Sequence, residues 1–257
     1  ICDRQWRIEF ANQKFTQLTG YEAASIIGKH PGALGDNDIE NRDSRHLWQS
    51  IRLQVQRVGV WQGEVNSVRR NGERYWEQLV VTPIKDSNSD TTGYLILGED
   101  ISIRKRYEQQ LLRQANYDVL TGLPNRMLAL DRLKLAIAQA RRDETQVGVM
   151  FLDLDNFKAY NDSLGHPAGD ALIRVFAEVL GRFSRRPMDL AARVGGEEFA
   201  LLLLDCDAQA AQAIAGQILA ALAERAVPHP ASPRSAYVTT SIGIAMWRSG
   251  QNAEQLY

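Results

Sequence analysis

Hydrophobic and polar positions divide the chain into two stretches that follow different patterns. In the first, residues 1–100, strand-like alternation and helical spacing of apolar residues succeed one another. The predicted order is one strand, two short helices, one longer helix and three antiparallel strands, which indicates an α+β domain. Asn71-Gly72 predicts a type I′ turn between two of these strands. The helices are expected at 12–18, 23–27 and 44–57, and the last three strands at 61–70, 73–86 and 94–99.

The second stretch, residues 118–257, alternates buried strands with amphipathic helices. A continuous apolar run at 147–152 predicts a strand that is buried on both faces. This alternation predicts an α/β domain of about 140 residues, which is an ordinary domain size. Further strands are expected at 190–194, 199–204 and 237–246, and helices around 127–137, 171–183 and 208–225.

The connecting segment, residues 101–117, has the spacing of a helix. Apolar residues recur every four positions from Ile103 to Ala115, and Asp100 or Ser102 can cap the helix by accepting a hydrogen bond from a free N–H group. The helix either rests on one of its own domains or pairs with a second copy and couples two sensors to two outputs. Its position between two domains favours the second interpretation.

The bulk composition narrows the class of protein. With 30 basic and 31 acidic side chains, the chain has no excess charge that would indicate nucleic acid or an anionic membrane as a partner. Cys2 and Cys206 have no metal-like spacing, so a reducing compartment, the cytoplasm, is the simplest expectation. No apolar run approaches the ~20 residues of a membrane-spanning helix. Because the chain stops at Tyr257 inside an unfinished pattern, we expect a fragment of a longer protein, whose other parts could include a membrane anchor.

Acidic residues at the ends of predicted strands are the first candidates for chemistry. Gly195-Gly196 can supply the positive φ of a tight hairpin, lets a ligand approach the backbone, and is followed by Glu197 and Glu198 at the tip. Asp153 ends the buried strand, where a carboxylate is costly unless it is paired or binds a metal. If the two strands are neighbours, Asp153 and Glu197 approach each other and favour Mg²⁺ together with nucleotide phosphates. The alternative is an ordinary hairpin with solvated acids.

Five motifs follow one another in the first stretch: Asn12-x-x-Phe15-x-x-Leu18-Thr-Gly-Tyr21, Ile27-Gly-Lys29, Trp61-x-Gly-Glu64, Arg70-Asn-Gly-Glu73 and Asp100-Ile-Ser102. Together they resemble a PAS sensor domain. The resemblance implies a domain that binds a small ligand, dimerises or transmits a signal, and it leaves the ligand unknown. The cysteine of light-sensing, flavin-binding relatives is absent, and His46 lies on the longer helix, where haem-binding relatives carry their ligand. His46 is alternatively a surface or packing histidine.

Five motifs follow one another in the second stretch: Asp118-x-Leu-Thr-x-Leu-Pro-Asn-Arg126, Phe151-x-Asp-x-Asp-x-Phe-Lys158, Asn161-Asp-x-x-Gly-His-x-x-Gly-Asp170, Arg193-x-Gly-Gly-Glu-Glu-Phe199 and Ser241-Ile-Gly243. In this order they resemble a GGDEF-type diguanylate cyclase domain. The resemblance implies that two GTP molecules are condensed into cyclic di-GMP with release of two pyrophosphates. Each subunit is expected to hold one GTP, so a homodimer is expected for catalysis.

The resemblance also implies a metal site and catalytic groups. Asp153 and Glu197 are expected to bind Mg²⁺ or Mn²⁺ through their side chains, and Leu154 through its carbonyl. Glu197 is also the candidate base for the attacking 3′-hydroxyl, with Glu198 as a candidate to assist, and the division between them is left open. Lys158 is expected to face the phosphates; without the motif, it is a solvated helix charge.

Substrate contacts follow from the same motifs. Asn161 and Asp170 are the expected guanine readers, because an amide and a carboxylate match the acceptor and donor edge of the purine. Asp170 can alternatively cap a helix, and His166 has substrate contact and packing as alternatives. Gly195 and Gly196 are expected to lie against the substrate.

A second ligand site is expected upstream of the hairpin. Arg186-Pro-Met-Asp189 stands six residues before Gly195 and matches the Arg-x-x-Asp product-inhibition site of many family members. Arg186 would bind phosphate and guanine, and Asp189 would accept hydrogen bonds from guanine. Family domains continue into a helix whose basic residues contact phosphates, so we expect the C-terminal end to be missing after Tyr257.

Two functions of different classes therefore stand. The first is a diguanylate cyclase that its PAS domain regulates through the helix at 101–117. The second is a non-catalytic module that binds GTP or cyclic di-GMP and controls a further domain, such as a phosphodiesterase.

Overall fold

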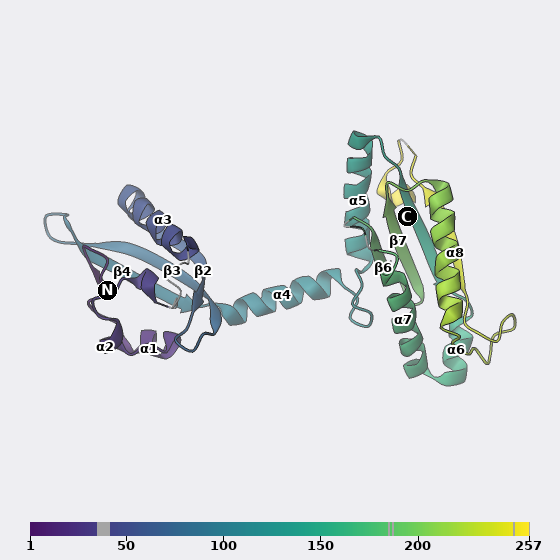
Figure 1. Ribbon diagram of the computed structural model, residues 1–257, viewed down its shortest axis with the longest axis horizontal. Coiled ribbons are helices and arrows are strands. Elements are labelled where there is room, and N and C mark those ends of the chain that lie inside the picture. The colour runs from purple at the N-terminus through teal and green to yellow at the C-terminus, as the bar shows by residue number, and fades with distance from the viewer. Residues whose placement is uncertain (35–41, 185, 187, 249, 257) are drawn as a thin grey trace. The chain divides into compact units, whose positions relative to one another are not determined.

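The computed structural model describes residues 1–34, 42–184, 186, 188–248 and 250–256. The chain divides into two compact units, Ile1–Gln110 and Leu111–Tyr257 (Figure 1).

The first unit is the α+β domain that the sequence predicts. Its sheet has four antiparallel strands in the order β1-β4-β3-β2. The core packs buried aromatic and aliphatic side chains against this sheet, with Trp6, Ile26 and Val81 among the most deeply buried. The strands are β1 (Cys2–Asp3), β2 (Trp61–Val68), β3 (Arg74–Lys85) and β4 (Thr91–Asp100), and the helices are α1 (Gln13–Thr19), α2 (Ala23–Ile26), the short 3₁₀ helix η1 (Pro31–Ala33) and α3 (Arg42–Val58).

The prediction of a type I′ turn at Asn71-Gly72 is wrong. That turn needs a positive φ at both residues, but of the two only Gly72 has one, at 86°. The Gly72 N–H donates to the Arg69 carbonyl at 2.9 Å, and the Arg69 N–H donates to the Glu73 carbonyl at 2.8 Å, which encloses a three-residue loop. The Arg70 N–H bonds to the Thr19 carbonyl at 2.9 Å. A contact with α1, which local sequence does not encode, therefore accompanies the longer turn.

Helix α4 (Ser102–Asn116) begins where the sequence predicts a cap. The Asp100 carboxylate accepts a hydrogen bond from the Ser102 N–H at 2.8 Å. Its predicted apolar stripe is not buried: the side chains of Ile103, Tyr107 and Leu111 are 63%, 63% and 64% exposed. Ile103 and Tyr107 therefore do not pack against the first unit, and Leu111 does not pack against the second.

The second unit is the predicted α/β domain, built on a sheet of order β6-β7-β5-β8 in which all neighbouring strands are antiparallel. Side chains of β5 alternate between two cores: Met150, Leu152 and Leu154 pack with α7 and α8, while Val147 and Val149 pack with α5. The central β5 is thus buried on both faces, as its continuous apolar run predicts. The strands are β5 (Val147–Leu154), β6 (Leu190–Arg193), β7 (Glu198–Leu204) and β8 (Thr240–Met246), and the helices are α5 (Arg126–Asp143), α6 (Phe157–Leu164), α7 (His166–Gly181), α8 (Ala208–Glu224) and α9 (Ala253–Leu256).

Candidate active site

The hairpin and the acidic strand end lie side by side. In the sheet register, Asp153 of β5 stands opposite Glu198 of β7 on one side and Ser241 of β8 on the other. Side chains of directly opposed residues share a face of the sheet, with Cβ atoms about 5 Å apart. The pKa of the Asp153 carboxyl is raised, chiefly by partial burial and then by the negative charges of Glu197, Glu198 and Asp155. Such a concentration of carboxylates favours a bound cation.

The backbone that follows Asp153 is held from both neighbouring strands. The Leu154 N–H points to the Glu197 carbonyl at 3.4 Å, on the hairpin side. On the β8 side, the Thr240 hydroxyl donates to the Asp153 carbonyl at 2.7 Å, and the Asp155 N–H donates to the Thr239 carbonyl at 3.0 Å. These contacts fix the direction of the strand end that carries Asp153 and the Leu154 carbonyl.

Asp155 has a structural role that the spacing of the sequence motifs did not predict. Its two carboxylate oxygens accept hydrogen bonds from the hydroxyls of Thr239 and Ser241, both at 2.6 Å. Short bonds of this kind to an ionised carboxylate are strong. Asp155 therefore ties the start of β8 to the end of β5 next to the candidate metal ligands.

The two hairpin glycines are needed for a different reason than the one expected. Positive φ is absent at both Gly195 and Gly196, so that expectation is wrong. The N–H groups of Val194 and Gly195 both bond to the Glu198 carbonyl, at 2.9 and 3.3 Å, which closes the turn without a left-handed residue. A Cβ on Gly195 would lie 2.2 Å from a carboxylate oxygen of Glu198, whereas one on Gly196 would meet no atom within 4 Å. Gly195 makes room for a carboxylate, and Gly196 faces open space.

An arginine holds the hairpin tip in place. Arg193 donates to the Gly196 carbonyl through Nε at 3.0 Å and through a terminal nitrogen at 2.7 Å. Its other terminal nitrogen lies 3.1 Å from both carboxylate oxygens of Asp118, which also accepts the Thr121 hydroxyl at 2.6 Å. Partial burial opposes ionisation of Asp118, but the hydrogen bonds from Thr121 and Arg193 outweigh it, and the pKa of this carboxyl lies below its ordinary value. The sequence motifs contain these residues, but 75 positions separate Arg193 from Asp118, and spacing did not pair them.

The candidate guanine readers lie on two consecutive helices. Asn161 is on α6, and its Oδ1 is buried with no hydrogen-bond partner in the described part of the chain. A Cβ on Gly169 would lie 1.8 Å from this Oδ1, so the glycine lets the amide pack against α7. Asp170 is exposed inside α7, which begins at His166, so Asp170 does not cap that helix.

The other two polar candidates of this region are free to meet a ligand. Lys158, in the first turn of α6, and His166, the first residue of α7, are both exposed. Neither side chain has a hydrogen-bond or ion-pair partner among the described residues. Packing, the alternative for His166, therefore does not account for it.

Arg186 and Asp189 lie at the far end of β7 from the hairpin. Asp189 accepts a hydrogen bond from the Leu204 N–H at 3.1 Å, and the Arg186 guanidinium points to the Leu204 carbonyl at 3.4 Å. Partial burial raises the pKa of the Asp189 carboxyl, although the Leu204 N–H and the Arg186 charge counteract it. The two side chains thus flank one backbone segment, with Arg186 exposed.

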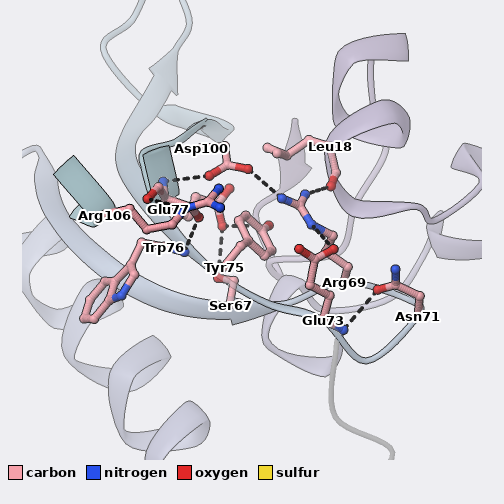
Figure 2. Close-up of polar contacts among 11 residues, drawn as sticks. Leu18, Ser67, Arg69, Asn71, Glu73, Tyr75, Trp76, Glu77, Asp100 and Arg106 are labelled. Carbon is pink, nitrogen blue, oxygen red and sulfur yellow. Dashed lines mark hydrogen bonds and ion pairs between the residues drawn. The ribbon is translucent and has the colours of Figure 1, made fainter. Parts of the chain in front are cut away.

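A cavity of about 550 Å³ lies in the first unit, with a polar wall formed by Ser67, Tyr75 and Glu77. The hydroxyls of Ser67 and Tyr75 donate to one oxygen of Glu77 at 3.0 and 3.2 Å (Figure 2). Burial raises the pKa of the Glu77 carboxyl, and these two hydrogen bonds only partly offset the effect. No histidine lines the described part of this cavity, and His46 is exposed on α3, so the haem interpretation does not fit.

A chain of polar contacts runs beside this wall to the start of α4. Arg69 bonds to the Leu18 carbonyl and to Asp100, at 2.5 Å from the latter, as Figure 2 shows. Asp100 caps α4, and the Ser102 hydroxyl accepts the Trp76 N–H at 2.9 Å. The first residues of α4 are therefore bonded to the strand that carries Glu77.

Among the described residues, none of the helices combines the length and the apolar composition that crossing a membrane requires.

Two families match this chain. The family described as "Diguanylate cyclase, GGDEF domain" matches residues 115–257, and a PAS domain family matches residues 1–102.

Among similar proteins of Escherichia coli (strain K12), the probable diguanylate cyclase DgcE is 35% identical over 224 residues, which cover 86% of this chain and 20% of that protein. The cyclic di-GMP phosphodiesterase PdeR is 39% identical over 249 residues, 96% of this chain and 36% of that protein. The chain thus spans well under half the length of either relative.

The crystal structure of the coiled coil and GGDEF domain of DgcB from Caulobacter crescentus in complex with c-di-GMP is also similar. It has a TM-score of 0.55 and 30% identity, and the match covers 61% of this chain and 82% of that one. Since the first family covers more than half of the sequence, this chain belongs to the GGDEF-domain family of diguanylate cyclases, with a PAS domain preceding that domain.

Proposed function

We propose that this protein is a diguanylate cyclase that condenses two GTP into cyclic di-GMP and releases two pyrophosphates. The observation that carries the proposal is the convergence of Asp153 with Glu197 and Glu198 where β5 meets the hairpin. A site that had lost its catalytic function would have no reason to keep three carboxylates at one strand end, because their mutual repulsion is costly. GTP is a cytoplasmic substrate, so we place this part of the protein in the cytoplasm.

The donor set fits Mg²⁺ or Mn²⁺. Asp153, Glu197 and the Leu154 carbonyl offer only oxygen ligands, which hard divalent cations prefer. Among the described residues, Asp153, Glu197 and Glu198 do not meet as a metal cluster of three side chains. Mg²⁺ does not need one, because it takes few protein ligands and fills its shell with phosphate oxygens and water. When bound, the metal would neutralise charge on the triphosphate.

The remaining candidate residues would neutralise the charge of the triphosphate, act as the base, or recognise the guanine. We assign Lys158 to the triphosphate, since its exposed ammonium is unpaired among the described side chains. We keep Glu197 as the base for the 3′-hydroxyl, with Glu198 assisting.

For recognition, Asn161 on α6 and Asp170 on α7 would bind the guanine edge, and the exposure of Asp170 supports its part in this assignment. His166 would contact substrate, and Gly196 leaves the backbone of the hairpin open to it.

Regulation is assigned to residues 1–100 and the helix at 101–117, ahead of a catalytic domain at 118–257. We propose that α4 pairs with α4 of a second copy, since Ile103, Tyr107 and Leu111 expose an apolar stripe. A dimer would bring two GTP-loaded sites face to face.

We propose that cyclic di-GMP binds to Arg186 and Asp189 and thereby inhibits the enzyme. This proposal is supported by the exposure of Arg186 and by the contacts that both side chains make with the backbone of Leu204, which hold them near each other.

The second candidate is a non-catalytic module that binds GTP or cyclic di-GMP and controls another domain. Its support is the 39% identity to a phosphodiesterase over 96% of this chain. Incubation of full-length dimeric protein with GTP and Mg²⁺ separates the two. Formation of cyclic di-GMP and pyrophosphate in a ratio of one to two supports the cyclase, while GTP binding without product supports the module.

A further inference from the structure

His229 is a buried polar residue that none of the sequence motifs contains. It lies between α8 and β8, and its side chain is only 2% exposed. Buried polar atoms are almost always hydrogen-bonded. The ring Nδ1 of His229 has no partner among the described residues, and Nε2 has one, the carbonyl oxygen of Asn156 at 3.3 Å.

This contact defines the proton position on the ring. A carbonyl oxygen only accepts hydrogen bonds, so Nε2 carries a proton and donates it to Asn156. The ring is held edge-on against Tyr160, with centroids 5.2 Å apart and planes at 83°. The His229 N–H donates to the Ala236 carbonyl at 2.9 Å, which fixes the backbone behind the ring. His229 is therefore a fixed donor directed at the carbonyl of the residue that precedes α6.

Asn156 is the junction that His229 contacts. It has φ 56° and ψ 30°, the left-handed conformation, which asparagine adopts more readily than most other residues except glycine. It starts α6, yet no side chain caps that helix end. Its carbonyl accepts the Tyr160 N–H at 3.1 Å in the first turn, and His229 supplies the second hydrogen bond to the same oxygen.

The position of Asn156 links it to the chemistry. It follows the Leu154 carbonyl by two residues and precedes Lys158 by two. A rotation of the Asn156 peptide would redirect both groups, since the intervening backbone is a single tight turn out of β5. Thr240 and Ser241 hold this turn from β8 through their hydroxyls, and His229 holds it through the Asn156 carbonyl.

We propose that His229 is a positioning residue of the cyclase site, which holds the β5–α6 turn through the Asn156 carbonyl so that the Leu154 carbonyl and Lys158 face metal and triphosphate. The inference rests on the proposed function of Asp153 and its neighbours. It assigns His229 no contact with substrate. Its effect is on the metal requirement, because partners that orient metal ligands typically alter metal affinity or activity by roughly 10–100-fold.

Three substitutions in the full-length protein test this. In His229→Gln the amide nitrogen reaches the position of Nε2 and keeps the donor. In His229→Asn the amide reaches only the position of Nδ1, and in His229→Phe the ring stays without any donor. The readout is Mn²⁺ binding in the presence of a non-hydrolysable GTP analogue, followed by electron paramagnetic resonance, with thermal unfolding measured in parallel.

The proposal predicts near wild-type Mn²⁺ binding for His229→Gln and roughly 10-fold weaker binding for His229→Asn and His229→Phe. Equal Mn²⁺ binding by the Gln and Asn variants overturns it, whatever their unfolding temperatures. If His229→Phe fails to fold, the Gln and Asn pair decides. Asp153→Asn is the reference: if that variant keeps metal-dependent binding, the proposed function itself fails, whereas its loss beside unaffected His229 variants refutes only the positioning role.

Discussion

Arg193 offers a perturbation whose size follows from the structure. It makes two contacts with the Asp118 carboxylate and two with the Gly196 carbonyl, between 2.7 and 3.1 Å. Its side chain is 14% exposed and that of Asp118 is 23% exposed. Arg193→Met keeps most of the packing volume, removes all four contacts, and leaves a partly buried carboxylate with only the Thr121 hydrogen bonds.

The expected cost is about 2–3 kcal/mol. A hydrogen bond to a charged group contributes about 1.5–3 kcal/mol, and partial exposure keeps the total well below the sum of four. For a unit of this size, 1 kcal/mol corresponds to roughly 3–4 °C, so the midpoint of the second unit should fall by roughly 6–12 °C. Cyclase activity should fall further than stability explains, since the Gly196 carbonyl and the hairpin lose their anchor.

A double-mutant cycle of Arg193→Met and Asp118→Asn, followed by calorimetry, measures the pair. We expect a coupling energy of about 1–2 kcal/mol. The low pKa of Asp118 adds a pH signature: because its folded pKa lies below the unfolded value, its stabilisation is full above about pH 4 and is lost as the pH falls further. Additive effects of the two substitutions, with the same acid dependence in Arg193→Met as in the wild type, would show that Arg193 and Asp118 do not stabilise the fold as a pair.

Three further predictions concern other parts of the molecule. Because the pKa of Glu77 is raised in the folded state, the first unit should lose stability as pH rises above the ordinary glutamate range, and Glu77→Gln should flatten that profile in pH-dependent unfolding; an unchanged slope would contradict it. Gly195→Ala should lower stability and activity more than Gly196→Ala, because its Cβ would lie 2.2 Å from a Glu198 oxygen, and equal unfolding midpoints would argue against this. Arg186→Ala should relieve inhibition of the initial rate by added cyclic di-GMP, and unaltered inhibition would end the feedback proposal.

The sequence predicted those parts of the fold that depend on local pattern. The apolar runs of β5 and β7 are long enough to require buried strands, and their adjacency then brings Asp153 to Glu198. The class of each domain followed from the alternation of periods. The turns at Asn71 and Gly195 did not follow from local sequence. A hydrogen bond from Arg70 to Thr19 accompanies the first turn, and hydrogen bonds from Val194 and Gly195 to the Glu198 carbonyl close the second.

The supporting contacts of the site lie beyond sequence spacing. Arg193 meets Asp118 across 75 residues, and His229 meets Asn156 across 73. Neither His229 nor Asn156 has a charge pattern or periodicity that marks it in the sequence. Only the packed fold shows that a buried ring nitrogen donates to the carbonyl of the residue that precedes α6.

The central claim is that the carboxylates at the β5–hairpin junction catalyse the condensation of GTP. The most direct measurement is cyclic di-GMP formed from GTP and Mg²⁺ by full-length wild type and Glu197→Ala, quantified by chromatography beside their thermal unfolding. We expect product from the wild type and none from a Glu197→Ala variant that unfolds at the wild-type temperature. Product formation by folded Glu197→Ala at the wild-type rate would contradict it.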